Sequence, residues 1–225
     1  MLEVKTCGLR DEPSVDVAVE AGATHLGFVH FPRSPRHLDA EAIARLVAHS
    51  AGRAKTVVVT VDADDATLGR LAATGIDTIQ LHGRETPERA RAVRERTGLP
   101  VVKAVAVSAA SDLEAAQAFD GIVHRLLLDA KAPPGAALPG GNGIGFDHAL
   151  LAHWSGGPFW LAGGLTPDNA AEAVRRVRPR GIDLSSGLER SPGEKDAGLI
   201  RDLFARLRHD APETHGSETH GSETP

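Results

Sequence analysis

The sequence has few residues that form covalent or metal cross-links, and it has no long apolar segment. Its single cysteine excludes an intramolecular disulfide framework and a cysteine-rich zinc site. No apolar run approaches the ~20 residues that a membrane-spanning helix needs, and the segment Met1–Lys5 has no signal-peptide pattern. We therefore expect a soluble cytoplasmic protein with no membrane partner.

Charge and composition narrow the class further. The net charge of −5 argues against general nucleic-acid binding, although local charge can still attract an anionic small molecule. Hydrophobic residues make up 41% of the chain, and 24 glycines among its 225 residues bring the apolar fraction close to the globular average of ~45–50%. A chain of this length and composition can bury a substantial core without disulfide bonds.

The segment 209–225 differs from the rest of the chain in composition. The unit Thr-His-Gly-Ser-Glu occurs at 214–218 and again at 219–223, and the segment has no large apolar residue. Because it has so little apolar surface to bury, it cannot offset the entropy of ordering, and we expect a disordered tail. Metal binding by His215 and His220 is disfavoured because the other ligands are missing.

Residues 1–208 alternate between short runs rich in Val, Ile and Leu, typical of buried strands, and longer segments with helical signals. Strands are expected at 2–7, 25–30, 55–61, 77–82, 100–106, 122–128, 159–162 and 182–185. Helices are expected at 13–21, 39–49, 65–73, 86–97, 111–118, 146–153, 167–177 and 196–208, two of them starting at Thr86-Pro87 and Thr166-Pro167. Strict alternation predicts a parallel sheet. Eight such units in one catalytic domain favour a (β/α)8 TIM barrel over the alternative, a doubly wound open sheet.

The ends of the last two strands carry a phosphate signal. Gly163 and Gly164 follow the seventh strand, and Ser185, Ser186 and Gly187 follow the eighth. Phosphate sites in such barrels use these two loops, where backbone N–H groups bind the anion. The alternative is that the glycines only permit tight turns, but their occurrence at two neighbouring strand ends favours phosphate binding.

Cys7 ends the first strand. A lone cysteine is commonly a small buried hydrophobic residue. A catalytic base, however, must be a thiolate, and its pKa must fall below the ordinary ~8.5. Strand parity points Lys5 and Cys7 into the barrel from the first strand, and Asp183 from the eighth. Because these strands are neighbours in a closed barrel, we predict an interior Lys5–Asp183 ion pair beneath the site.

Asp129 ends the sixth strand after three leucines. Apolar surroundings would disfavour its ionised form and let it hold a proton near neutral pH. The alternative is a helix or loop cap, for which aspartate is well suited. A thiolate base and a protonated Asp129 form a mutually consistent catalytic pair, since an ionised Asp129 close to Cys7 would oppose formation of the thiolate.

Three further side chains follow strands that end at the same face. Arg33 and Arg36 follow the second strand, and a guanidinium can bind a carboxylate through two parallel hydrogen bonds. His82 follows the fourth strand and either lines the pocket or bonds to backbone as a core histidine. The remaining histidines have no His-Glu-x-x-His or comparable spacing, so we expect no metal.

The longest irregular stretch, 130–145, is rich in Gly and Pro and follows the sixth strand. Loops of this length in a compact domain are usually functional. Gly141 and Gly143, on either side of Asn142, superficially resemble a nucleotide-binding loop. The Walker lysine and a following Gly-x-x-Gly are absent, so dinucleotide binding is rejected.

Taken together, these positions resemble the phosphoribosylanthranilate isomerase family of tryptophan biosynthesis. The resemblance runs in order from residue 2 to about residue 205 and falls at matching strand ends. The matching segments are Val4-Lys5-Thr6-Cys7-Gly8-Leu9, Gly27-Phe28-Val29, Ser34-Pro35-Arg36, Ile79-Gln80-Leu81-His82-Gly83, Leu127-Leu128-Asp129, Leu161–Asn169, Gly181–Glu189 and Pro192-Gly193-Glu194-Lys195-Asp196.

The resemblance implies a (β/α)8 barrel that needs no cofactor. Such an enzyme converts N-(5-phosphoribosyl)anthranilate into 1-(2-carboxyphenylamino)-1-deoxyribulose 5-phosphate by an Amadori rearrangement. By position, Cys7 would be the general base, Asp129 the general acid, and Arg36 the group that holds the anthranilate carboxylate. Segments 163–164 and 185–187 would hold the phosphate.

The loop after the sixth strand departs from the family pattern. The family commonly has Thr or Ser followed by Gly-Lys, whereas this chain has Asn142-Gly143-Ile144. The missing hydroxyl and cation leave backbone contacts from Gly141, Asn142 and Gly143 as the way in which this loop would bind phosphate.

Two other functions are compatible with the same sequence. One is an isomerase acting on a related phosphorylated aminoaldose, but those barrels resemble an arrangement with two Asp residues, and Cys7 favours the tryptophan enzyme. The other is a catalytically silent phosphosugar-binding barrel, which would need neither Cys7 nor Asp129. The sequence leaves a monomer and a homodimer both open.

Overall fold

The computed structural model describes residues 1–130, 151 and 154–209. Strands and helices alternate along this part of the chain, as the sequence pattern predicts. The barrel strands are β1 (Glu3–Cys7), β2 (His25–His30), β3 (Lys55–Thr60), β4 (Thr78–Leu81), β5 (Val101–Val107), β6 (Arg125–Ala130), β7 (Phe159–Ala162) and β8 (Gly181–Leu184). The helices are α1 (Glu12–Ala21), α2 (Ala40–Ser50), α3 (Asp65–Ala72), α4 (Pro87–Thr97), α5 (Ala110–Gln117), α7 (Ala170–Val177) and α8 (Ala197–His209).

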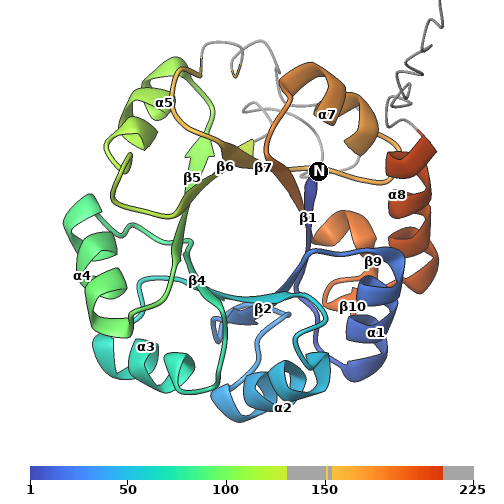
Figure 1. Cartoon of the computed structure of the whole chain (residues 1–225), viewed down its shortest axis with the longest axis horizontal. Helices are drawn as coiled ribbons and strands as arrows, with labels where there is room; N and C mark the ends of the chain where they lie inside the picture. Colours follow the sequence, from blue (N-terminus) through green and yellow to red (C-terminus); the bar gives the residue numbers. More distant parts are fainter. Residues whose placement is uncertain (131–150, 152–153, 210–225) are drawn as a thin grey trace, which may run out of the picture.

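The eight strands form one closed parallel barrel in the order β1 to β8, and the helices surround it (Figure 1). Closure depends on the pairing of β1 with β8, in a register that sets Lys5 beside Asp183. The closed ring confirms the predicted (β/α)8 barrel and rules out the open doubly wound sheet. Because all strands run in one direction, their carboxyl ends meet at one face of the molecule.

Apolar side chains pack in two places, outside and inside the barrel. Outward-facing strand residues such as Val4, Ile79 and Ile182 pack against the helices in the larger cluster. Inward-facing residues of β3, β5, β6 and β7 form a second cluster, namely Val57, Val102, Ala104, Leu127, Trp160 and Ala162. Trp160 packs edge-on against His25, with ring centroids 4.7 Å apart, near the amino end of the barrel. These side chains fill the interior of the barrel below its carboxyl end, so a pocket can form only among the loops at that end.

Helix boundaries follow the prediction where a capping side chain and a glycine define them. Thr86 Oγ1 accepts a hydrogen bond from the backbone N–H of Arg89 at 3.2 Å, and Pro87 is the first residue of α4. Gly22 and Gly98 adopt the left-handed conformation after α1 and α4, with φ values of 116° and 67°. These positions suit glycine because it has no Cβ to clash with the following carbonyl.

Helix α7 starts later than predicted from Thr166-Pro167. Asn169 Oδ1 accepts a hydrogen bond from the Thr166 backbone N–H at 2.8 Å, which holds residues 166–169 as a turn. The helix then begins at Ala170. The predicted start was three residues too early, because residues 167–169 form a turn before the first helical residue.

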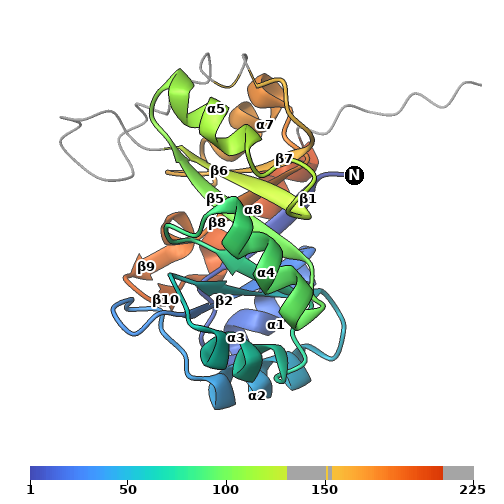
Figure 2. The same cartoon turned by 90° about the vertical axis from the view of Figure 1, so that its left-hand side faces the viewer.

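A hairpin after β8 was not predicted. A short 3-10 helix (Ser186–Leu188) leads into β9 (Glu189–Ser191), which pairs with β10 (Glu194–Lys195). Strands of three and two residues are too short to show a pattern in the sequence. Figure 2 shows that the hairpin and the N-terminus lie on opposite sides of the molecule, so the hairpin belongs to the carboxyl end of the barrel.

The predicted helix 146–153 and the stretch 130–145 lie outside the described residues, apart from Ala130 and Leu151. The predicted tail also lies outside them, apart from His209, which ends α8. No helix in the described ranges is long and apolar enough to cross a membrane.

Candidate active site

A pocket of about 340 Å³ lies among the loops that follow the barrel strands. It brings together most of the predicted site residues, namely Cys7, Arg36, His82, Asp129, Gly163, Gly164, Ser185 and Ser186. Gly187 does not line the pocket. A Cβ at this position would collide with the carbonyl oxygen of Leu165, so this glycine allows two loops to pack closely. Gly141, Asn142 and Gly143 lie outside the described residues.

Cys7 is buried at the end of β1, at the floor of this pocket. Gly27 on β2 makes room for it, since a Cβ there would lie 2.9 Å from Cys7 Sγ. Burial raises the pKa of the Cys7 thiol, although Lys5 and Lys195 act to lower it. The pKa shift is opposite in direction to the one that a catalytic base needs, because lost hydration outweighs the nearby ammonium groups.

The predicted ion pair beneath the thiol is present. Lys5 Nζ lies 3.0 Å from each carboxylate oxygen of Asp183, and the two side chains are 0% and 8% exposed. Burial by itself would lower the pKa of Lys5, but the charges of Asp183 and Cys7 raise it above its ordinary value. Lys5 is therefore a permanent positive charge below Cys7 at neutral pH.

Asp129 contacts a histidine across the pocket. Its Oδ2 lies 3.4 Å from His82 Nε2, and its side chain is 29% exposed, more than the preceding leucines suggested. Gln80 Nε2 lies 3.0 Å from His82 Nδ1. A donor on that side leaves the imidazole proton on Nε2, where it faces the carboxylate.

Gln80 is a site residue that sequence reasoning missed. It lines the pocket although only 1% of it is exposed, and its Oε1 has no hydrogen-bond partner among the described residues. The signal available in the sequence was its inward parity on β4, two residues before His82.

Arg36 is engaged by a second residue that the sequence analysis did not assign. Its Nε and Nη2 donate to the two carboxylate oxygens of Glu189 at 2.7 and 2.6 Å. Lys195 Nζ donates to the same carboxylate at 2.6 Å. One edge of the guanidinium is therefore already paired. Arg33 is exposed and does not line the pocket.

The loops after β7 and β8 have backbone N–H groups suited to an anion. Gly163 and Gly164 have φ values of 97° and 60°, the left-handed region that glycine tolerates. Their N–H groups, and those of Ser185 and Ser186, donate no hydrogen bond to another described residue. Unpaired N–H groups at two adjacent loops can together bind a phosphate.

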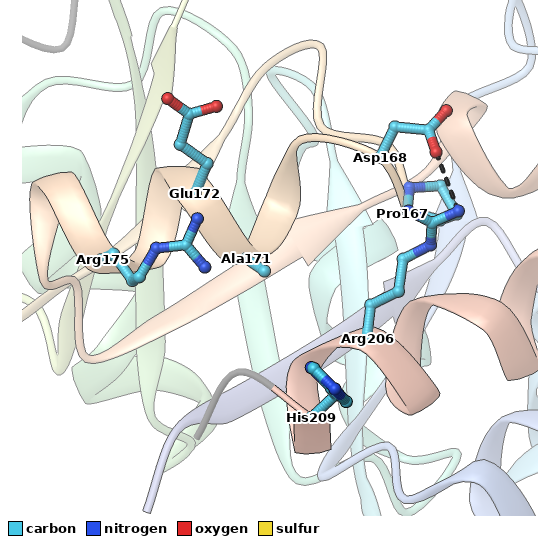
Figure 3. A pocket seen from close by; sticks show the side chains of 7 residues that line it. All are labelled: Pro167, Asp168, Ala171, Glu172, Arg175, Arg206 and His209. Carbon is cyan, nitrogen blue, oxygen red and sulfur yellow. Dashed lines mark ion pairs between the residues drawn. The ribbon is translucent and has the colours of Figure 1, made fainter. Parts of the chain in front are cut away.

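A second pocket, of about 290 Å³, lies on the outside of the barrel, near α7 and α8 (Figure 3). Two of its charged residues, Arg206 and Asp168, form an ion pair at 3.0 Å. It contains none of the predicted catalytic residues. Within the described ranges, no group of three or more His, Cys, Asp or Glu side chains could hold a metal ion.

Comparisons with known proteins agree on one family. The model of the family described as N-(5'phosphoribosyl)anthranilate (PRA) isomerase matches residues 4–206. The chain is 52% identical over 210 residues to the N-(5'-phosphoribosyl)anthranilate isomerase of Chelativorans sp. strain BNC1, covering 92% of this chain and 96% of that protein.

Solved structures show the same similarity. The crystal structure of phosphoribosyl anthranilate isomerase from Thermotoga maritima superposes with a TM-score of 0.84 at 32% identity, covering 93% of this chain and 100% of that one. A phosphoribosyl anthranilate isomerase in complex with reduced 1-(o-carboxyphenylamino)-1-deoxyribulose 5-phosphate superposes with a TM-score of 0.82 at 31% identity, covering 93% and 100% of the two chains.

Proposed function

Because the chain belongs to the N-(5'-phosphoribosyl)anthranilate isomerase family, and is thus an isomerase of tryptophan biosynthesis, we propose that the pocket at the carboxyl end of its barrel is the active site. In this proposal Asp129 is the general acid and Cys7 the general base. The observation that carries it is that both side chains, contributed by strands on different sides of the barrel, line the same pocket.

Asp129 opens the sugar ring. A protonated Asp129 donates to the furanose oxygen, the C1–O bond breaks, and the anthranilate nitrogen supplies the electrons that form a Schiff-base cation. The His82 Nε2–H, 3.4 Å from Asp129 Oδ2, then faces the carboxylate that this step produces. A donor that faces a newly formed carboxylate stabilises its negative charge, so His82 would support this step.

Cys7 acts on the Schiff-base cation. As a thiolate it removes the proton at C2, which gives an enolamine, and tautomerisation moves one proton from the C2 oxygen to C1 to form the ketone. Lys5 beneath the thiol and Lys195 beside it favour the thiolate, against the effect of burial. Because the anthranilate nitrogen accepts the electrons, the expectation of no cofactor follows from the chemistry and stays a prediction.

The two anionic ends of the substrate have separate partners among the residues that line the pocket. Arg36 would bind the anthranilate carboxylate, and the phosphate would bind the N–H groups at 163–164 and 185–186, which donate to no other described residue. In support, a similar structure is a complex with a reduced carboxyphenylamino deoxyribulose phosphate. A role for Gly141, Asn142 and Gly143 at the phosphate stays a prediction.

An activity assay tests the assignment. Freshly generated phosphoribosylanthranilate is fluorescent through its anthranilate group, and its isomerisation is followed by loss of that signal. Each proton-transfer group contributes roughly 10²–10⁴ in rate, so the Cys7→Ala and Asp129→Ala variants are each expected to lose at least two orders of magnitude in turnover while still folding. Near-normal turnover by the purified Cys7→Ala protein would remove Cys7 from the mechanism. A wild-type protein that binds the substrate without turnover would instead favour the silent phosphosugar-binding barrel.

The remaining expectations extend this proposal. A catalytic domain over residues 1–208 followed by a disordered tail, a cytoplasmic location, a monomer or homodimer, and no nucleic-acid partner all stay predictions. Limited proteolysis of the full chain tests the boundary between the domain and the tail, and light scattering tests the oligomeric state.

A further inference from the structure

Glu189 is a buried carboxylate that binds two cations at the edge of the pocket. It accepts hydrogen bonds from Arg36 Nε and Nη2, from Lys195 Nζ at 2.6 Å and from the backbone N–H of Gly193 at 3.2 Å. The side chains of Glu189 and Lys195 are 3% and 2% exposed. Both oxygens are therefore used within the protein, so this carboxylate is unsuited to proton transfer with substrate and suited to holding other groups in place.

The hairpin that carries Glu189 is packed against the segment that carries Arg36. Gly193, in the turn between β9 and β10, has a φ of +87°, and a Cβ there would lie 2.7 Å from the carbonyl oxygen of Pro35. The Arg36 side chain crosses Gly8, where a Cβ would lie 2.6 Å from Arg36 Cδ. The guanidinium is thus held from two sides, and its direction depends on contacts that are distant in sequence.

The remaining edge of the guanidinium is available to a ligand. Within the described residues, no hydrogen bond joins Arg36 Nη1 to the protein, while Arg36 itself lines the pocket. One carboxylate between Arg36 and Lys195 leaves a surplus of positive charge on this side. The arrangement can therefore accept one more carboxylate on the Nη1 and Nη2 edge, in the two-bond geometry that guanidinium groups favour.

We propose that Glu189 is a positioning residue that aims Arg36 and so determines preference for a substrate whose aromatic ring carries a carboxylate. This inference rests on the proposed role of Arg36 at the active site. Positioning and a purely electrostatic effect of Glu189 change the affinity for the ring carboxylate in opposite directions. Removing a negative charge next to Arg36 would strengthen attraction for an anion, whereas loss of positioning weakens the contact.

A pair of binding probes separates these effects. The first probe is the reduced 1-(o-carboxyphenylamino)-1-deoxyribulose 5-phosphate, and the second is the same compound without its ring carboxylate. Isothermal titration gives the ratio of their dissociation constants for each protein. The carboxylate preference of the wild-type protein is expected to be at least tenfold, as one charge-assisted bidentate contact of ~1.4 kcal/mol or more would give.

The Glu189→Gln variant should lose most of this preference while its affinity for the second probe changes less than about threefold. Glu194→Gln is the matched control, because Glu194 lies in the same hairpin but is exposed and pairs with Arg190. The control should keep the wild-type ratio. A Glu189→Gln protein with an unchanged or increased ratio would overturn the inference.

Two further variants keep the outcome decisive. If Glu189→Gln does not fold because two cations lose their shared anion, Glu189→Gln combined with Lys195→Met restores the balance of charge and is measured in its place. Arg36→Met tests the premise. If it keeps the preference, the proposed role of Arg36 fails, whereas if it abolishes the preference and the Glu189 variants keep theirs, only the role of Glu189 fails.

Discussion

Replacing Lys5 by methionine is expected to destabilise the barrel strongly, because it leaves the Asp183 carboxyl group without its partner in the interior. The pair consists of two contacts of 3.0 Å between side chains that are 0% and 8% exposed. At 3.0 Å and an effective dielectric constant of ~20, the attraction between unit charges is about 5–6 kcal/mol. Desolvation offsets much of that gain, so the intact pair adds little net stability, but removing one partner of a buried pair costs about 3–5 kcal/mol.

The replacement of both partners distinguishes an unpaired charge from a simple loss of volume. Lys5→Met combined with Asp183→Leu removes both charges and should recover a large part of the loss. A coupling energy of at least ~2 kcal/mol is expected between the two substitutions. Because the pKa of Lys5 is raised above its unfolded value, the stability from this group is fully present below about pH 10 and declines as the pH rises through the higher folded value. Measurements at pH 7.5 therefore report the intact pair.

Urea denaturation, followed by circular dichroism, gives the free energy of unfolding for the wild type, both single variants and the double variant. Lys55→Met is the matched control, because the Lys55–Asp77 ion pair has a similar length, 2.8 Å, but its lysine side chain is 68% exposed. Its urea midpoint should stay close to that of the wild type. If Lys5→Met unfolds at nearly the wild-type urea concentration, or if the double variant is no more stable than the sum of the single changes predicts, the reasoning from burial is refuted.

Three other expectations follow from the interior of the barrel. Burial lowers the pKa of His25 to about 4, so the free energy of unfolding should decrease as the pH falls from about 6.5 towards 4. In the His25→Gln variant this decrease should be smaller, by up to about 3 kcal/mol. Urea denaturation of both proteins at the two pH values measures the difference. Gly27→Ala places a Cβ 2.9 Å from Cys7 Sγ and should lower turnover at least tenfold. Gly69→Ala is the control, because nothing lies within 4 Å of the added Cβ. It should leave turnover unchanged and stabilise α3 by about 0.5–1 kcal/mol. An unaffected Gly27→Ala enzyme would contradict the tight fit. Because burial raises the pKa of Cys7, the only thiol in the chain, alkylation by iodoacetamide should accelerate with pH at values above 9.0, and a midpoint near neutral pH would contradict this environment.

Much of the barrel could be predicted because its signals are local. The eight apolar runs, the cap at Thr86 and the glycines after α1 and α4 act through residues within a few positions of each other. Parity also placed Lys5 and Asp183 correctly, since alternation along a strand is a local property and only closure had to be assumed. Helix α7 shows the limit, because a turn at residues 167–169 moves its start from the predicted position to Ala170.

The residues missed at the site act through contacts that sequence spacing does not reveal. Glu189 and Arg36 are 153 positions apart, and nothing near either residue indicates that they pair. Gln80 was recognisable only as an inward-facing polar residue, and its link to His82 depends on side-chain direction. The direction of the Cys7 pKa shift could not be predicted from the sequence either. Burial raises this pKa and the neighbouring lysines lower it, and the net shift depends on distances and exposure that only the structure gives.

The sequence by itself determined the order of strands and helices, the strand ends at which polar residues gather and the family to which those residues point, since each depends on short-range pattern and residue type. Only the tertiary structure decided that Glu189 holds Arg36, that Lys195 reaches the same carboxylate and that burial raises the pKa of the Cys7 thiol. The reason is that closing the barrel brings distant segments together at its carboxyl end, where hydrogen bonding and desolvation, rather than residue type, set the charge and direction of each group.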